Sequence, residues 1–72
     1  MDIKKGDKFR HFKGNVYQII TLAKDSEDLK DLVVYQNVLT KDVWVRPLDE
    51  FLSKVDKVKY PNVKDEYRFT KI

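Results

Sequence analysis

The segment VWVRPLDEF, residues 43–51, changes its structural pattern part-way along. Its first four residues place β-branched side chains on both sides of the only tryptophan, which is typical of a strand. Pro47 has a fixed φ and no amide hydrogen, so it disfavours helix before it and suits the first position of a helix. Apolar residues then follow at helical spacing, namely Leu48, Phe51, Leu52 and Val55. The segment therefore predicts a strand over 43–46 and a short helix inside 47–55.

Alternating apolar residues elsewhere predict four more strands, over 8–12, 16–24, 32–38 and 66–70. Gly14 begins the strongest hairpin signal, and we expect it to require a positive φ. Both faces of the longest strand are largely apolar, which indicates strong bending. Five short antiparallel strands with one helical turn before the last are typical of an SH3-like small barrel. An α+β roll is the competing architecture.

The length of 72 residues predicts one domain, residues 1–72. The chain has no cysteine and no long apolar run, so we expect a cytoplasmic protein without a membrane segment. Its net charge of +3 is distributed unevenly, because both ends are basic and the middle third is acidic. This distribution favours attraction between segments of the chain, or alternatively a basic face for nucleic acid.

Several motifs occur in order along the chain: RHFKGN at 10–15, SE at 26–27, VVY at 33–35 and WVRPL at 44–48. Together they resemble a small bacterial family known as a domain of unknown function. The resemblance covers roughly residues 6–55 and continues weakly to 68–69. It implies an SH3-like small barrel and no established activity. Thr40 and the pair Leu29-Lys30 depart from the family pattern, and both departures lie in connections between strands.

The residue arrangements that enzymes use for catalysis are largely missing from this sequence, and its carboxylate clusters, Asp49-Glu50 and Asp25-Glu27-Asp28, are explained by surface charge. His11 is the only histidine, so no site with two histidines can form, and no cysteine can act as nucleophile. Ser26 and Ser53 lack the glycine-framed turn of serine hydrolases, and no glycine-rich phosphate loop occurs. We therefore expect a protein that is not an enzyme and that has no metal site and no cofactor.

Five residues are candidates for a ligand-binding surface: Arg10, His11, Tyr35, Trp44 and Arg46. The alternative for the histidine is a ring packed on a tyrosine or phenylalanine and bonded to a backbone carbonyl. The tryptophan is expected in the core, because a domain this small needs its largest apolar side chain buried. If half exposed, it becomes a stacking platform instead. The tyrosine is equally ambiguous, and its hydroxyl needs a partner if it is buried.

Arg46 follows Trp44 by two residues, so the two side chains share one face of their strand. An arginine that is held in this way can clamp one planar anion through its guanidinium fork. We expect that anion to be the carboxylate of Glu27, in an internal ion pair. The alternative is an anionic ligand, for which Arg46 would be free.

Two functions of different classes fit these residues. The leading one is a non-catalytic binding module whose aromatic and arginine surface holds a peptide or a small planar ligand. The alternative is binding of single-stranded RNA through basic ends and exposed aromatics. The modest net charge and the acidic middle third speak against the alternative.

Overall fold

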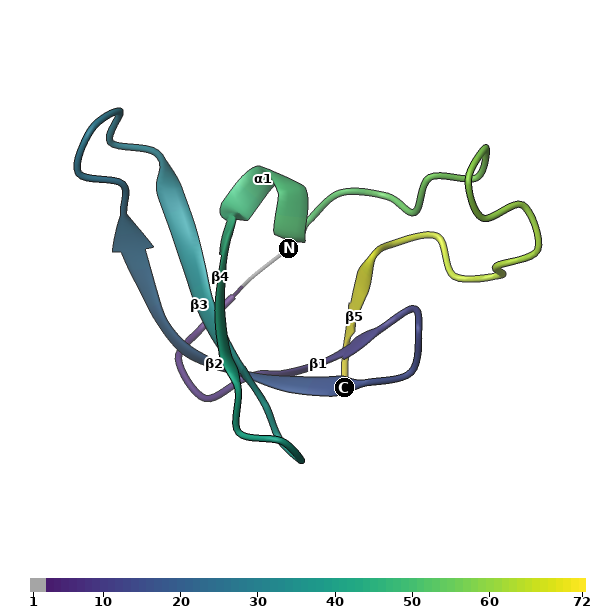
Figure 1. Cartoon of the computed structure of the whole chain (residues 1–72), viewed down its shortest axis with the longest axis horizontal. Helices are drawn as coiled ribbons and strands as arrows, with labels where there is room; N and C mark the ends of the chain where they lie inside the picture. Colours follow the sequence, from purple (N-terminus) through teal and green to yellow (C-terminus); the bar gives the residue numbers. More distant parts are fainter. Residues whose placement is uncertain (1–2) are drawn as a thin grey trace.

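The computed structural model describes residues 3–72, which form one antiparallel sheet with a single turn of helix (Figure 1). The elements are β1 (Lys8–His11), β2 (Val16–Lys24), β3 (Asp31–Asn37), β4 (Val43–Pro47), α1 (Leu48–Phe51) and β5 (Phe69–Lys71). In space the strands follow the order β4-β3-β2-β1-β5, so the last strand returns to pair with the first. The mainly β fold of the SH3-like type, with a short helix before the last strand, is confirmed.

Local conformations agree with the turn chemistry of the sequence. Gly14 has a φ of +107°, as predicted, and its amide donates to the carbonyl of His11 at 2.8 Å. The pairing of β2 with β3 shifts register between Ile19 and Thr21, which is a bulge that bends the long strand. Pro47 is the last residue of β4 and the N-cap of α1, one position earlier than predicted. A proline fits there because β4 is an edge strand.

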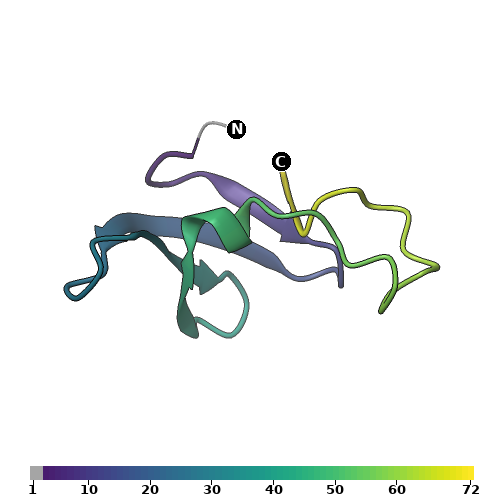
Figure 2. The ribbon, with the colours of Figure 1, turned by 90° about the horizontal axis from the view of Figure 1, so that it is seen from above.

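The final strand begins at Phe69 rather than at residue 66. The residues before it pair with another segment, since Tyr67 forms an isolated bridge with Lys54 and the Arg68 amide donates to the Ser53 carbonyl at 3.0 Å. These contacts hold the end of the long α1–β5 connection against its beginning. The connection and the turn between β1 and β2 lie on the same side of the molecule in both views (Figure 1 and Figure 2).

Aromatic rings fill the core between the sheet and α1. The buried apolar side chains that form the cluster are Phe9, Ile19, Val33, Tyr35, Phe51 and Phe69. The ring of Phe51, from α1, stacks on that of Phe69, from β5, with a centroid distance of 4.0 Å. This stack joins the helix to one edge of the sheet. Within residues 3–72 no helix has the length and apolar character needed to cross a membrane.

Trp44 is not part of this core, contrary to the expectation from the sequence. Its side chain is 53% exposed, although its cross-strand neighbour Tyr35 is only 4% exposed. The physical reason is position: β4 is the edge of the sheet, so Trp44 has a neighbouring strand on one side only. The phenylalanine and tyrosine rings already occupy the interior.

Candidate functional site

A cavity of about 290 Å³ opens beside the turn between β1 and β2. One wall comes from that turn, one from β4, and one from the connection between α1 and β5. The amide of Phe12 donates to the carbonyl of Arg68 at 3.0 Å and ties two of these walls together. The lining residues are His11, Phe12, Lys13, Arg46, Val55, Asp56, Lys59, Tyr60 and Arg68.

Positive charge dominates this cavity. Four of its lining side chains are lysine or arginine, and only one, Asp56, is a carboxylate. Like charges repel at short distance, so such a concentration is unfavourable unless a counterion or an anionic ligand compensates it. The cavity therefore attracts anions, and it does so in a chain whose overall net charge is only +3.

Arg46 is held at the cavity by two contacts with the core. Its Nε donates a hydrogen bond to the hydroxyl oxygen of Tyr35 at 3.2 Å. Its guanidinium carbon also lies 5.9 Å from the centroid of the Phe69 ring, in cation–π geometry. Arg46 belongs to β4 and Phe69 to β5, so this side chain spans the space between the two edge strands. A buried tyrosine hydroxyl requires a hydrogen-bond partner, and for Tyr35 that partner is the Nε of Arg46.

Arg68 is held in a similar way at the opposite wall. Its Nε lies 3.3 Å from the Oγ of Ser53, and its backbone amide donates to the Ser53 carbonyl at 3.0 Å. Two guanidinium groups are therefore fixed at one cavity, each through a hydroxyl group of a neighbouring residue. Fixed arginine forks suit carboxylate and phosphate groups, because both are recognised through paired hydrogen bonds.

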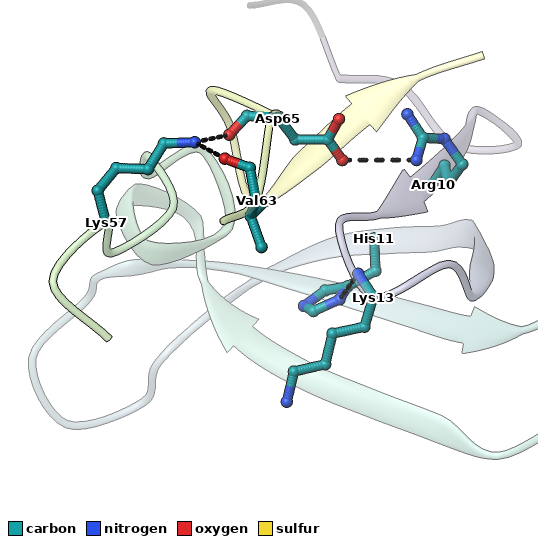
Figure 3. A network of polar contacts seen from close by, with 6 residues as sticks. All are labelled: Arg10, His11, Lys13, Lys57, Val63 and Asp65. Atoms are coloured by element: carbon teal, nitrogen blue, oxygen red, sulfur yellow. Dashed lines mark hydrogen bonds and ion pairs between the residues drawn. The ribbon is translucent and has the colours of Figure 1, made fainter. Parts of the chain in front are cut away.

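His11 is a neutral hydrogen-bonding group in this site. Its Nδ1 accepts a hydrogen bond from the backbone amide of Lys13 at 3.1 Å, so the proton of the neutral ring is on Nε2 (Figure 3). Burial, helped by the nearby cations Arg46, Lys13 and Arg68, lowers the pKa of His11 from 6.5 to about 4. The ring also stacks on Phe12 with centroids 4.4 Å apart. His11 therefore packs on an aromatic ring as one alternative expected, but its backbone partner is the Lys13 amide and not a carbonyl, and the residue also lines the cavity.

Two aromatic rings and two lysines form the outer wall. The rings of Phe12 and Tyr60 meet edge to face with centroids 5.0 Å apart. The Nζ atoms of Lys13 and Lys59 lie 5.4 Å and 5.5 Å from the centroid of the Tyr60 ring. A hydrogen bond from Lys13 is the main cause that lowers the pKa of the Tyr60 hydroxyl. The wall thus combines two aromatic rings, inclined at 62° to each other, with positive charge over the Tyr60 ring.

The connection that carries Lys59 and Tyr60 has an internal clamp. The Nζ of Lys57 donates to the carbonyl oxygens of Val63 and Asp65, at 2.5 Å and 2.6 Å (Figure 3). The amide of Tyr60 also donates to the carbonyl of Asp56 at 2.8 Å. These bonds shape a segment that has no helix or strand of its own between α1 and β5.

Three of the five ligand-binding candidates, namely Arg10, Tyr35 and Trp44, are not among the residues that line the cavity. Arg10 points away from His11 and forms an ion pair with Asp65 at 3.4 Å (Figure 3), because adjacent residues of a strand face opposite sides. Trp44 does not line the cavity.

The predicted ion pair between Glu27 and Arg46 is wrong. Among the residues described, the ion pairs of the structure do not join these two side chains. Arg46 bonds Tyr35 instead, while the Glu27 amide donates to the Asp25 carboxylate at 2.8 Å within the exposed β2–β3 turn. The carboxylates of Asp25 and Asp28 thus accept backbone hydrogen bonds within this turn.

The comparisons with known proteins agree with the fold and with the sequence motifs. A family model described as protein of unknown function, DUF1653, matches residues 7–71. The chain belongs to the DUF1653 family. It is similar to a crystal structure of a DUF1653 protein from Bordetella bronchiseptica, with 26% identity and a TM-score of 0.78. The match covers 99% of this chain and 88% of that chain. No curated protein matches.

The cavity of this DUF1653 protein contains residues that sequence reasoning missed. Phe12, Lys13, Lys59, Tyr60 and Arg68 join the predicted His11 and Arg46. Phe12 and Lys13 directly follow His11 in the hairpin motif, so their position in the sequence could have predicted them. Lys59, Tyr60 and Arg68 lie in the α1–β5 connection, which has no regular pattern of apolar residues from which the direction of a side chain can be predicted.

Proposed function

We propose that this DUF1653 protein is a non-catalytic binding module whose cavity holds a small planar anion. The observation that carries the proposal is the pair of guanidinium groups, Arg46 and Arg68, each fixed by a neighbouring hydroxyl group at the cavity wall. Side chains that are already fixed lose less conformational entropy when a ligand binds. Lys13 and Lys59 add charge, while His11 supplies a neutral donor at Nε2.

The size and the wall of the cavity support a small ligand rather than an extended peptide. Its volume of about 290 Å³ lies at the lower end for small-molecule sites. The rings of Phe12 and Tyr60 give the wall aromatic contacts for a flat group, and the lysine ammonium groups lie over the Tyr60 ring. A ring that carries one phosphate or carboxylate group matches both features. Chemistry is not required by this arrangement, because its donors serve to bind and to neutralise charge.

Phenyl phosphate, inorganic phosphate and phenol are suitable probes, since they separate the anionic group from the ring. We expect phenyl phosphate to bind with a dissociation constant on the order of 1 mM, which is realistic for so small a ligand. Inorganic phosphate should bind more weakly, and phenol should not bind detectably. The measurement is a titration at pH 7.5 followed by amide NMR shifts. Equal affinity for phenol and phenyl phosphate would refute an anion site.

Two lysines of the same connection provide a matched pair of variants. Lys59 lines the cavity, whereas Lys64 does not, and both are exposed. Lys59→Gln should weaken phenyl phosphate by about threefold, the effect of one exposed charge. Lys64→Gln should leave the affinity unchanged. The same loss in both variants would mean that general surface charge, and not this cavity, attracts the probe.

Single-stranded RNA is the second candidate, and the aromatic rings beside cations are the observation that favours it. An RNA site extends over several nucleotides, so its affinity grows with the number of phosphates contacted. The probe that separates the two functions is an oligonucleotide of eight uridines. Binding of this RNA more than about a hundredfold tighter than phenyl phosphate, with steep salt dependence, would favour RNA as the ligand.

A further inference from the structure

The two edges of the sheet differ in how well they are protected. Natural edge strands are usually very short, or they carry charges, prolines or bulges that prevent pairing with another chain. β5 has three residues and ends in Lys71, which forms an ion pair with Asp7 at 3.1 Å. β4 is longer, and three consecutive apolar side chains in it are exposed: Val43 by 58%, Trp44 by 53% and Val45 by 61%.

The backbone of β4 also has hydrogen-bonding groups that point outward. The amide of Asn37 donates to the carbonyl of Asp42 at 2.9 Å, so these two residues form a hydrogen-bonded pair. In an antiparallel ladder such pairs alternate with pairs that are not bonded. Trp44 and Arg46 therefore bond to β3, whereas the amides and carbonyls of Val43 and Val45 face away from the sheet. By the same alternation the backbone of Pro47 is not hydrogen-bonded to β3. This is consistent with proline, which has no amide hydrogen to donate.

We propose that β4 pairs antiparallel with β4 of a second copy of this chain, across a two-fold axis at Trp44. In this register Val43 lies opposite Val45 of the second copy, and each such pair exchanges two backbone hydrogen bonds. The two Trp44 side chains face each other at the axis, where strands approach closely and aromatic pairs are favourable. The five strands of each copy then form one continuous sheet.

Charge complementarity favours a second copy of this chain as the partner that pairs with β4. The register that centres on Trp44 sets Asp42 opposite Arg46 of the second copy, and by symmetry Arg46 opposite Asp42. The sequence DVWVR, residues 42–46, is thus complementary to itself when reversed. Moving the axis by one residue in either direction sets Trp44 opposite Asp42 or Arg46 and loses both matched charge pairs. A two-fold interface requires this kind of self-complementary surface.

The contact is small, so the dimer is weak. Each copy contributes chiefly one strand of five residues, Val43–Pro47, and interfaces well below the standard size are transient. Outward N–H and C=O groups of Val43 and Val45 supply directional bonds, and the three apolar side chains supply burial. We expect a mass near the 8.6 kDa of one chain at about 10 µM and near twice that value at about 1 mM.

Sedimentation equilibrium over this concentration range tests the proposal. Val45→Lys, at an exposed position of the edge, should stay monomeric at about 1 mM, the concentration at which the weak dimer forms. Val58→Lys is the matched control, because Val58 is also exposed but lies in the α1–β5 connection, and it should dimerise like the wild type. A wild type that stays monomeric at that concentration, or a Val45→Lys dimer of unchanged affinity, would overturn the proposal.

Hydrogen exchange gives a second readout that does not depend on any substitution. The amides of Val43 and Val45 should exchange more slowly as the protein concentration rises, while those of Trp44 and Arg46 are already protected in the monomer. Asp42→Arg, which sets like charges opposite each other, should weaken the dimer by about tenfold, the equivalent of about 1.4 kcal/mol. Rapid, concentration-independent exchange at Val43 and Val45 would exclude pairing at β4.

Discussion

The hydrogen bond from the Nε of Arg46 to the Tyr35 hydroxyl, at 3.2 Å, determines how the arginine is presented to the cavity. Tyr35→Phe removes this hydroxyl and keeps the ring in its contacts with Tyr17, Phe51 and Phe69. The freed guanidinium is only partly buried and regains water. We therefore expect the free energy of unfolding to fall by about 0.5–1.5 kcal/mol, the net value of one hydrogen bond.

Arg46→Met perturbs the same bond from the other side, at a greater cost. Tyr35 is 4% exposed, so its hydroxyl is left without a partner where water has little access. The cation–π contact with Phe69 is lost as well. Together these losses should lower the free energy of unfolding by about 1–3 kcal/mol. In the double variant no hydroxyl is left unpaired, so the two costs should fail to add by about 1 kcal/mol.

Urea unfolding followed by circular dichroism measures the four members of this cycle. Glu27→Gln combined with Arg46→Met is the control cycle, because no ion pair among the described residues joins these two side chains. Its coupling energy should lie within about 0.3 kcal/mol of zero. A Tyr35–Arg46 coupling as small as that of the control, or a larger Glu27–Arg46 coupling, would refute the reasoning.

Three further predictions concern the hairpin and His11. Gly14→Ala should lower the free energy of unfolding in urea by about 1 kcal/mol, because an L-residue is strained at a φ of +107° even though no atom would clash with its Cβ; a loss no greater than that of Lys13→Ala would show that the turn tolerates any residue. His11 has a folded pKa of about 4, below its usual 6.5, so the unfolded chain binds its proton first. Stability should therefore be complete above pH 6.5 and fall between pH 6.5 and 4, by about 1–2 kcal/mol after allowance for partial exposure; an unchanged pH profile in His11→Gln would contradict this. Saturating phenyl phosphate should raise the pKa of His11, since an adjacent anion favours the charged ring, and a ring titration by NMR that does not move would place the probe elsewhere.

The sequence predicts a strand, turn or helix of this fold well where it depends only on residues close together in the chain. The β-rich composition of residues 16–24 predicts a strand there, and the structure has β2 at Val16–Lys24. Glycine chemistry at Gly14 and the change of period after Pro47 likewise depend on neighbouring residues only, and both are confirmed. The order of β1 to β4 in space follows because short turns favour pairing of consecutive strands, whereas β5 reaches β1 after the long α1–β5 connection.

Predictions fail where the outcome depends on position in the sheet. Trp44 has strong strand character whether its strand is central or at the edge, and only the edge position leaves it exposed. Arg46 bonds the hydroxyl of Tyr35, on the neighbouring strand β3, and not the carboxylate of Glu27. This partner is eleven residues earlier in the chain and comes close only because β3 pairs with β4.

The cavity was predicted only in part for the same reason. His11 and Arg46 carry local signals, namely a hairpin motif and a proline that follows the arginine. Lys59 and Tyr60 come from a connection without periodicity, and tertiary hydrogen bonds such as those of Lys57 place them. A run of lysines in such a segment resembles an ordinary solvated surface until the fold brings it beside two arginines.

Amide NMR titration of Arg46→Lys with phenyl phosphate tests the binding function most directly. Arg46→Lys keeps the positive charge but loses the guanidinium fork, and Arg10→Lys is the matched control, since Arg10 lies outside the cavity and pairs with Asp65. In the wild type we predict saturable shifts that centre on Phe12, Lys13, Tyr60 and Arg68. Affinity should fall by about tenfold in Arg46→Lys and stay unchanged in Arg10→Lys, as a bidentate contact to the anion requires. Shifts that centre away from these residues, or equal losses in the two variants, would contradict a planar-anion site at this cavity.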